Sequence, residues 1–107
     1  MDNEKIERQI AEKMVDDALA AGYTIDVWDG GDFPLKQSSD REAILKAMFS
    51  TDEDRLYLTK DGKTAWVWLV YGNSYHLISD YTISLATVLA GAEKLSDELE
   101  DQYGQAA

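Results

Sequence analysis

Apolar side chains recur at helical spacing in one long segment at each end of the chain. The apolar stripe of the first segment, about Asn3–Ala21, is Ile6, Ile10, Met14 and Ala18. The stripe of the second segment, about Leu85–Gln102, is Leu85, Val88, Leu89, Ala92, Leu95 and Leu99. A shorter pattern predicts a third helix over Asp40–Phe49, which Ser39 and Glu42 open as a capping box. We therefore predict three amphipathic helices, two of them long.

Between the helices the pattern changes to the period of two that is typical of strands. The predicted strands are Tyr23–Trp28, Phe33–Gln37, Arg55–Lys60, Lys63–Tyr71 and Tyr75–Ser79. Turn residues such as Asp61-Gly62 join consecutive strands as hairpins, and Pro34 places its strand at a sheet edge. The predicted fold class is α+β, with the order α-β-β-α-β-β-β-α. Hairpins imply an antiparallel sheet of about five strands with the helices packed on it.

The strand Lys63–Tyr71 is apolar on both of its faces. Ala65, Val67 and Leu69 alternate with Trp66 and Trp68, so the two tryptophans point away from the face that the helices cover. In one interpretation, a further helix of the same chain covers the tryptophans. In the other, they form an exposed aromatic surface for a partner or for self-association, together with Trp28, Tyr57, Tyr75 and Leu77. The sequence leaves both interpretations open.

Length and charge limit the classes of function. A chain of 107 residues with 45% hydrophobic residues forms one domain, 1–107, with frayed ends expected at 1–2 and 104–107. Twenty-one acidic against ten basic residues give a net charge of −11. This charge argues against direct binding to nucleic acid or to an anionic membrane. The segment Met1–Arg8 is charged and lacks the apolar run of a signal peptide, and the longest apolar run, Ala65–Tyr71, is far shorter than the ~20 residues of a membrane span, so we expect a cytoplasmic protein.

The residues that carry most enzyme and metal chemistry are scarce. The chain has no cysteine and one histidine, which argues against thiol catalysis, zinc sites and histidine clusters. His76 and Asp80 resemble a base and its orienting acid, but no nucleophile motif accompanies them. The acidic run Asp52–Asp54 lacks the spacing of a calcium loop and is interpreted as a solvated turn. We therefore predict no enzyme, no catalytic residue, no metal and no cofactor.

Acidic residues gather toward the C-terminal ends of both long helices. The last helix carries Glu93, Asp97, Glu100 and Asp101 on one face, and the first carries Glu12 and Asp16. Negative charge at these positions opposes the helix dipole, which weakly indicates a function other than folding. Carboxylates four residues apart rise about 6 Å along a helix, close to two phosphate steps of one DNA strand. Such a surface suits a basic groove, although an ordinary solvated face is the simpler interpretation.

Several short segments resemble small acidic uncharacterised proteins of bacteria, their phages and mobile elements. The segments that carry the resemblance are Ala21–Tyr23, Ser39–Arg41, Phe49–Asp54, Tyr71–Asn73 and Ile78–Thr82. The resemblance implies a small accessory protein of phage or prophage origin. In that setting such proteins are often inhibitors of host defence, such as anti-CRISPR or anti-restriction proteins, some of which mimic DNA. No site residues follow from it.

The leading functional hypothesis is a non-enzymatic acidic protein that inhibits a host nucleic-acid-binding defence complex by partial DNA mimicry. Its alternative is a homodimeric interaction or assembly module that uses the aromatic sheet face. The predicted partner-binding residues are Glu93, Asp97, Glu100, Asp101, Glu12, Asp16, Trp66 and Trp68. The expected partner is a protein with a basic groove, with no direct nucleic-acid or membrane contact.

Overall fold

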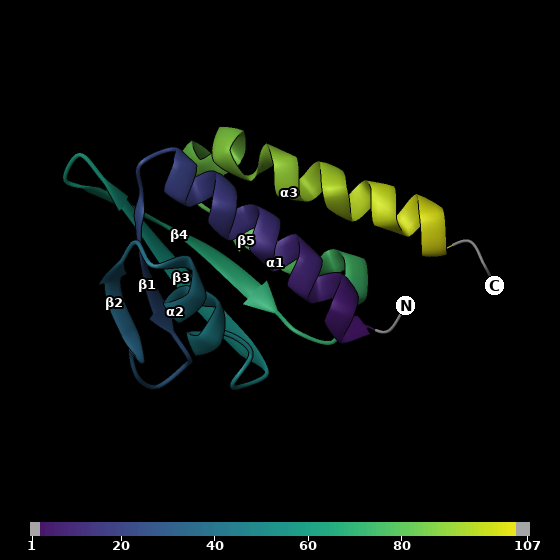
Figure 1. Cartoon of the computed structure of the whole chain (residues 1–107), viewed down its shortest axis with the longest axis horizontal. Helices are drawn as coiled ribbons and strands as arrows, with labels where there is room; N and C mark the ends of the chain where they lie inside the picture. Colours follow the sequence, from purple (N-terminus) through teal and green to yellow (C-terminus); the bar gives the residue numbers. More distant parts are fainter. Residues whose placement is uncertain (1–2, 105–107) are drawn as a thin grey trace.

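The fold is one antiparallel sheet with helices packed on it (Figure 1). A computed structural model describes residues 3–104. The helices are α1 (Asn3–Ala20), α2 (Arg41–Ala47) and α3 (Ala86–Leu99). The strands are β1 (Thr24–Trp28), β2 (Leu35–Ser38), β3 (Glu53–Lys60), β4 (Lys63–Val70) and β5 (Ile78–Tyr81). Their order in the sheet is β2-β1-β3-β4-β5, so the predicted class, strand number and element order are confirmed.

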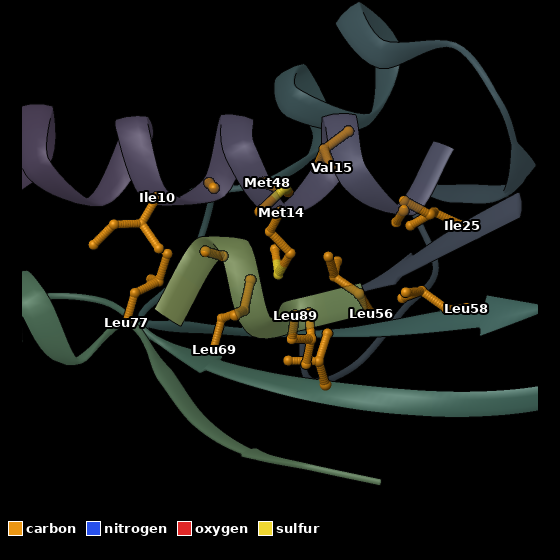
Figure 2. Close-up of a cluster of buried hydrophobic side chains, with 14 of the residues drawn as sticks. Ile10, Met14, Val15, Ile25, Met48, Leu56, Leu58, Leu69, Leu77 and Leu89 are labelled. Carbon is orange, nitrogen blue, oxygen red and sulfur yellow. The ribbon is translucent and has the colours of Figure 1, made fainter. Parts of the chain in front are cut away.

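Aliphatic side chains from one face of the sheet and from the helices form the core. On the sheet side these are Ile25 and Val27 of β1, Leu56 and Leu58 of β3, and Ala65, Val67 and Leu69 of β4. Met14, Val15 and Leu89 pack on them from α1 and α3, which lie side by side over the sheet (Figures 1 and 2). The predicted stripes of both long helices therefore face this core.

The strand register gives the two sheet faces different side chains. Leu56 pairs with Val27 on one side and Val67 on the other, which places three core residues in one row. The adjacent row is Trp28, Arg55, Trp68 and Asp80, across β1, β3, β4 and β5. Since neighbouring residues of a strand point to opposite faces, this second row lies on the face away from the core.

The segment before the last strand differs from the prediction. Instead of a strand over Tyr75–Ser79, residues Ser74–His76 form a 3-10 turn, and β5 begins at Ile78. Glu7 of α1 is almost completely buried and accepts hydrogen bonds from the amides of Gly72 (2.7 Å) and Ser74 (3.0 Å). This contact, 65 and 67 residues away along the chain, holds the turn in place of a strand.

Three helix ends also differ from the predicted ones. Asp40, rather than Ser39, caps α2, because its carboxylate accepts from the amides of Glu42 and Ala43. The helix stops at Ala47, and Phe49 adopts a positive φ of 67°. The α-helical part of α3 ends at Leu99, and a π-helical turn, Glu100–Gly104, follows. Of the predicted frayed ends, residues 1–2 and 105–107 lie outside the described residues, and Gly104 belongs to the π turn.

Candidate functional site

The face of the sheet opposite the core has no helix over it in the described part of the chain. We define the open face as Trp28 of β1, Arg55 and Tyr57 of β3, Trp66 and Trp68 of β4, and Phe33 of the β1–β2 connection. The strand side chains of this set are part-exposed, whereas their neighbours along the strands are buried. The interpretation that a helix covers Trp66 and Trp68 is therefore wrong.

Aromatic rings of the open face contact one another between β1, β3 and the β1–β2 connection. The Phe33 ring lies 6.4 Å from Trp28 and 5.9 Å from Tyr57, measured between ring centroids. Phe33 keeps 37% of its surface exposed and is one of the exposed large hydrophobic residues in the described part of the chain. Trp28, Trp66 and Trp68 are the three tryptophans of the protein, so all of them lie on this face. Tyr75 and Leu77, which were expected nearby, pack in or against the core instead.

Arg55 lies at the centre of the open face, on the middle strand of the five. Its guanidinium carbon is 5.4 Å from the ring centroid of Trp28, 5.5 Å from Trp66 and 5.9 Å from Trp68. These distances fall within the range of cation–π attraction. The Nε atom of Arg55 is buried and has no hydrogen-bond partner in the described residues. The centre of the face is thus a cation held by three indole rings.

Carboxylates surround the open face. Glu53 accepts a hydrogen bond from the Trp68 indole nitrogen (3.0 Å), and Asp26 accepts one from the Gln37 amide (2.6 Å). Asp80, which pairs across the strands with Trp68, accepts from the amide of Tyr81 (2.8 Å). Each of these acids uses one oxygen for a contact within the chain. We call Asp26, Glu53 and Asp80 the acidic rim.

The predicted acidic site on the last helix is only partly assembled. Glu93 and Asp97 line a hollow of about 180 Å³ beside the 3-10 turn, together with Tyr75, His76, Ile78 and Ser96. Glu100 contacts His76, with 3.3 Å between Oε2 and Nε2. Asp101 is exposed and belongs to the π turn rather than to the α-helix. Three of the four acids therefore lie close to η1 (Ser74–His76), and a histidine contacts one of them.

The acids predicted as a second patch on the first helix are engaged in ion pairs. Arg41 of α2 contacts Asp16 (2.6 Å) and Glu12 (3.4 Å), and it also contacts Glu42 (2.9 Å). The hydrogen bonds to Asp16 and Glu42 raise the pKa of Arg41 above its ordinary value. Glu12 and Asp16 thus help to hold α2 against α1, and Arg41 offsets part of their charge.

Asp54 is not in a solvated turn, contrary to the prediction for the run Asp52–Asp54. It lies in β3 and is fully buried on the core side. Its carboxylate accepts from the Phe49 amide (3.0 Å) and from the hydroxyl of Tyr71, and its Oδ1 has no hydrogen-bond partner among residues 3–104. Burial raises the pKa of Asp54, and burial together with the Asp54 carboxylate raises the pKa of Tyr71. Sequence reasoning missed this site because the strand begins two residues earlier than expected.

His76 and Asp80 lie in different places, so they do not form a base and its orienting acid. His76 is exposed in the 3-10 turn and contacts Glu100, whereas Asp80 lies on the open face opposite Trp68. His76 belongs to the predicted strand Tyr75–Ser79, and the turn that Glu7 holds is the reason for the difference. Within residues 3–104, no group of three or more His, Cys, Asp or Glu side chains is arranged to hold a metal ion.

The chain has no recognised relative in three kinds of comparison. No family model, curated protein or solved structure matches it. None of the helices in residues 3–104 has the length and apolar character needed to cross a membrane. The arrangement of side chains described above is therefore the basis for a functional proposal.

Proposed function

We propose that this chain is a non-enzymatic binding protein that recognises a protein partner through its open face. The observation that supports this proposal is the set of three tryptophans, a tyrosine and a phenylalanine around Arg55 on a sheet face without a covering helix. Trp, Tyr and Arg are the residues that most often dominate binding energy in protein interfaces.

The negative charge of the molecule indicates a partner with a basic surface. The net charge is −11, and the acidic rim places carboxylates beside the aromatic rings. A partner with basic side chains around its contact surface complements the acidic rim, and long-range attraction speeds its association. Two copies of this chain would each bring a charge of −11, which opposes self-association through the same face. Nucleic-acid-binding proteins have such basic surfaces, so an inhibitor of a host defence complex remains the specific form of this proposal.

The acids of α3 are a second candidate for the contact surface. Glu93, Asp97 and Glu100 gather beside η1, with a small hollow between the two elements. This grouping supports the idea of a helix that occupies a groove built for a phosphate backbone. It ranks second because charged faces without apolar neighbours usually provide solubility.

The two candidate surfaces are distinguished by capturing partners with matched variants. Tagged wild type is incubated with a bacterial lysate beside Trp66→Ser/Trp68→Ser and Glu93→Gln/Asp97→Asn/Glu100→Gln. We expect the wild type and the α3 variant to retain the same basic protein in equal amount, and the tryptophan variant to lose it. Retention should fall at high salt, because exposed charges are screened within about 8–10 Å at physiological ionic strength.

Three outcomes would contradict the proposal. Loss of the partner with the α3 variant alone would assign the contact to the acidic helix. Recovery of this protein alone at both salts, with a dimer in sedimentation experiments, would favour the assembly module. Retention that is equal for wild type and both variants would show that neither surface is used.

A further inference from the structure

We propose that Arg55 is the anchor of the open face and binds the carboxylate of an Asp or Glu side chain of the partner. In the partner, this acidic residue is flanked by basic residues. This inference rests on the proposed function and adds the chemistry of the partner segment. It starts from an unusual feature of a chain that has 21 acidic residues: the partly buried guanidinium of Arg55 pairs with no carboxylate of the described residues.

The surroundings of Arg55 hold its planar group without using its hydrogen-bond donors. Three indole rings lie within 6 Å of the guanidinium carbon, and they come from β1 and β4 on the two sides of β3. Within residues 3–104 the guanidinium makes no hydrogen bond and no ion pair, and its Nε is buried without a partner. An arginine carries five N–H donors, and leaving them unpaired is costly.

The nearby carboxylates of the chain have other partners. Glu53 is two residues from Arg55 on the same face of β3, yet it accepts from the indole of Trp68. Asp26 and Asp80 accept from backbone amides instead. The acidic rim therefore surrounds Arg55 without neutralising it, and it leaves the centre of the face positive and its edge negative.

A partner segment with the opposite pattern fits this surface. A carboxylate matches the two parallel N–H groups of a guanidinium, and the indole rings exclude water, which strengthens the contact. Basic side chains on either side of that carboxylate would then lie near Asp26, Glu53 and Asp80. A doubly charged phosphate fits the same fork, but the net charge of −11 opposes it more strongly than a single carboxylate among bases.

A random peptide library displayed on phage tests this inference without a known partner. The library is selected on the wild-type protein, and the enriched peptides are synthesised together with twins in which each carboxylate is replaced by the amide. Dissociation constants are then measured for wild type, Arg55→Lys, Arg55→Gln and Trp66→Ser/Trp68→Ser. Circular dichroism and thermal unfolding check that each variant is folded.

We expect enriched peptides to share one acidic residue within a basic segment. The wild type should bind the acidic peptide about tenfold or more tightly than its amide twin, the gain expected from a charge-assisted pair. Arg55→Gln should bind the two twins equally, and Arg55→Lys should keep part of the preference because it keeps charge but loses the fork.

The possible failures separate the two proposals. If Arg55→Gln binds the acidic peptide as tightly as wild type while the tryptophan variant loses it, the carboxylate inference is wrong and the proposed contact surface stands. If the wild type binds an acidic peptide and its amide twin equally, the carboxylate inference is likewise wrong and the proposed contact surface stands. If nothing is enriched, or if the tryptophan variant binds as well as wild type, both the inference and the proposed use of the open face are wrong.

Discussion

The two faces of one sheet differ in chemistry although the same strands build them. The covered face is aliphatic, and Ile25, Val27, Leu56, Val67 and Leu69 are at most 1% exposed. The open face consists of aromatic rings around a guanidinium and keeps a part-exposed surface with acids at its edge. The first composition is typical of a packed core and the second of an interface. A substitution on the covered face should therefore change mainly stability, and one on the open face mainly binding.

The largest effect is expected from Leu69→Ala on the covered face. Leu69 is fully buried, so its truncation leaves a cavity and should lower the free energy of unfolding by about 2–5 kcal/mol. Urea denaturation measures this change, and Val70→Ala on the adjacent, part-exposed position is the control. Equal losses for the two variants would contradict the difference between the faces.

A smaller loss of stability is expected from Trp66→Ser/Trp68→Ser on the open face. The substitutions remove cation–π contacts and cross-strand packing, which together should cost about 1–3 kcal/mol. The same variant should lose partner binding completely. Calorimetry measures the stability of the variant, and a binding titration measures its affinity for the partner. Binding that persists in the folded variant would show that the open face has no role in recognition.

Asp54→Asn tests the one carboxylate buried on the covered face of the sheet. Burial raises the pKa of Asp54 above its ordinary 3.8, so the folded state prefers the protonated form. The contribution of Asp54 to stability is therefore full below pH 3.8 and is lost as the pH rises through the raised pKa, by at most about 1.4 kcal/mol per pH unit.

The wild type minus Asp54→Asn difference in unfolding free energy isolates this group from the other acids. It should become less favourable to the wild type with increasing pH, because Asp54 titrates and asparagine does not. The asparagine is a matched reference, since it keeps an oxygen for the Phe49 amide and the Tyr71 hydroxyl. A difference that is independent of pH would show that Asp54 titrates alike in the folded and unfolded states.

The smallest effect is expected from Glu93→Gln/Asp97→Asn/Glu100→Gln. These acids lie toward the C-terminal end of α3, where negative charge opposes the helix dipole by about 0.3–1 kcal/mol per residue at most. Their removal should raise the melting temperature slightly and leave binding through the open face unchanged. A large loss of affinity would transfer the binding site to α3.

Most of the fold follows from local patterns in the sequence. The stripes of the long helices, the alternation in β1 and β4 and the Asp61-Gly62 turn are each read within a few residues, and the structure confirms them. The strand before the last helix was misplaced because Glu7, a residue far away in the chain, fixes the turn. Contacts of this kind leave no local periodicity.

The candidate site was predictable only in part. The alternation in β4 placed Trp66 and Trp68 on one face, and β1 added Trp28. Arg55 was predicted as the first residue of a strand and not as a site residue, because its place among three indoles depends on the register of β1, β3 and β4. Likewise, the pairing of Glu12 and Asp16 with Arg41 depends on how α2 packs against α1.

Fluorine NMR of fluorotryptophan-labelled protein tests the central claim most directly. All three tryptophans lie on the open face and none lies on α3, so their signals report contact with that face alone. When the captured partner is added, the account predicts that all three signals shift. A stoichiometric complex that leaves the three signals unchanged would contradict it.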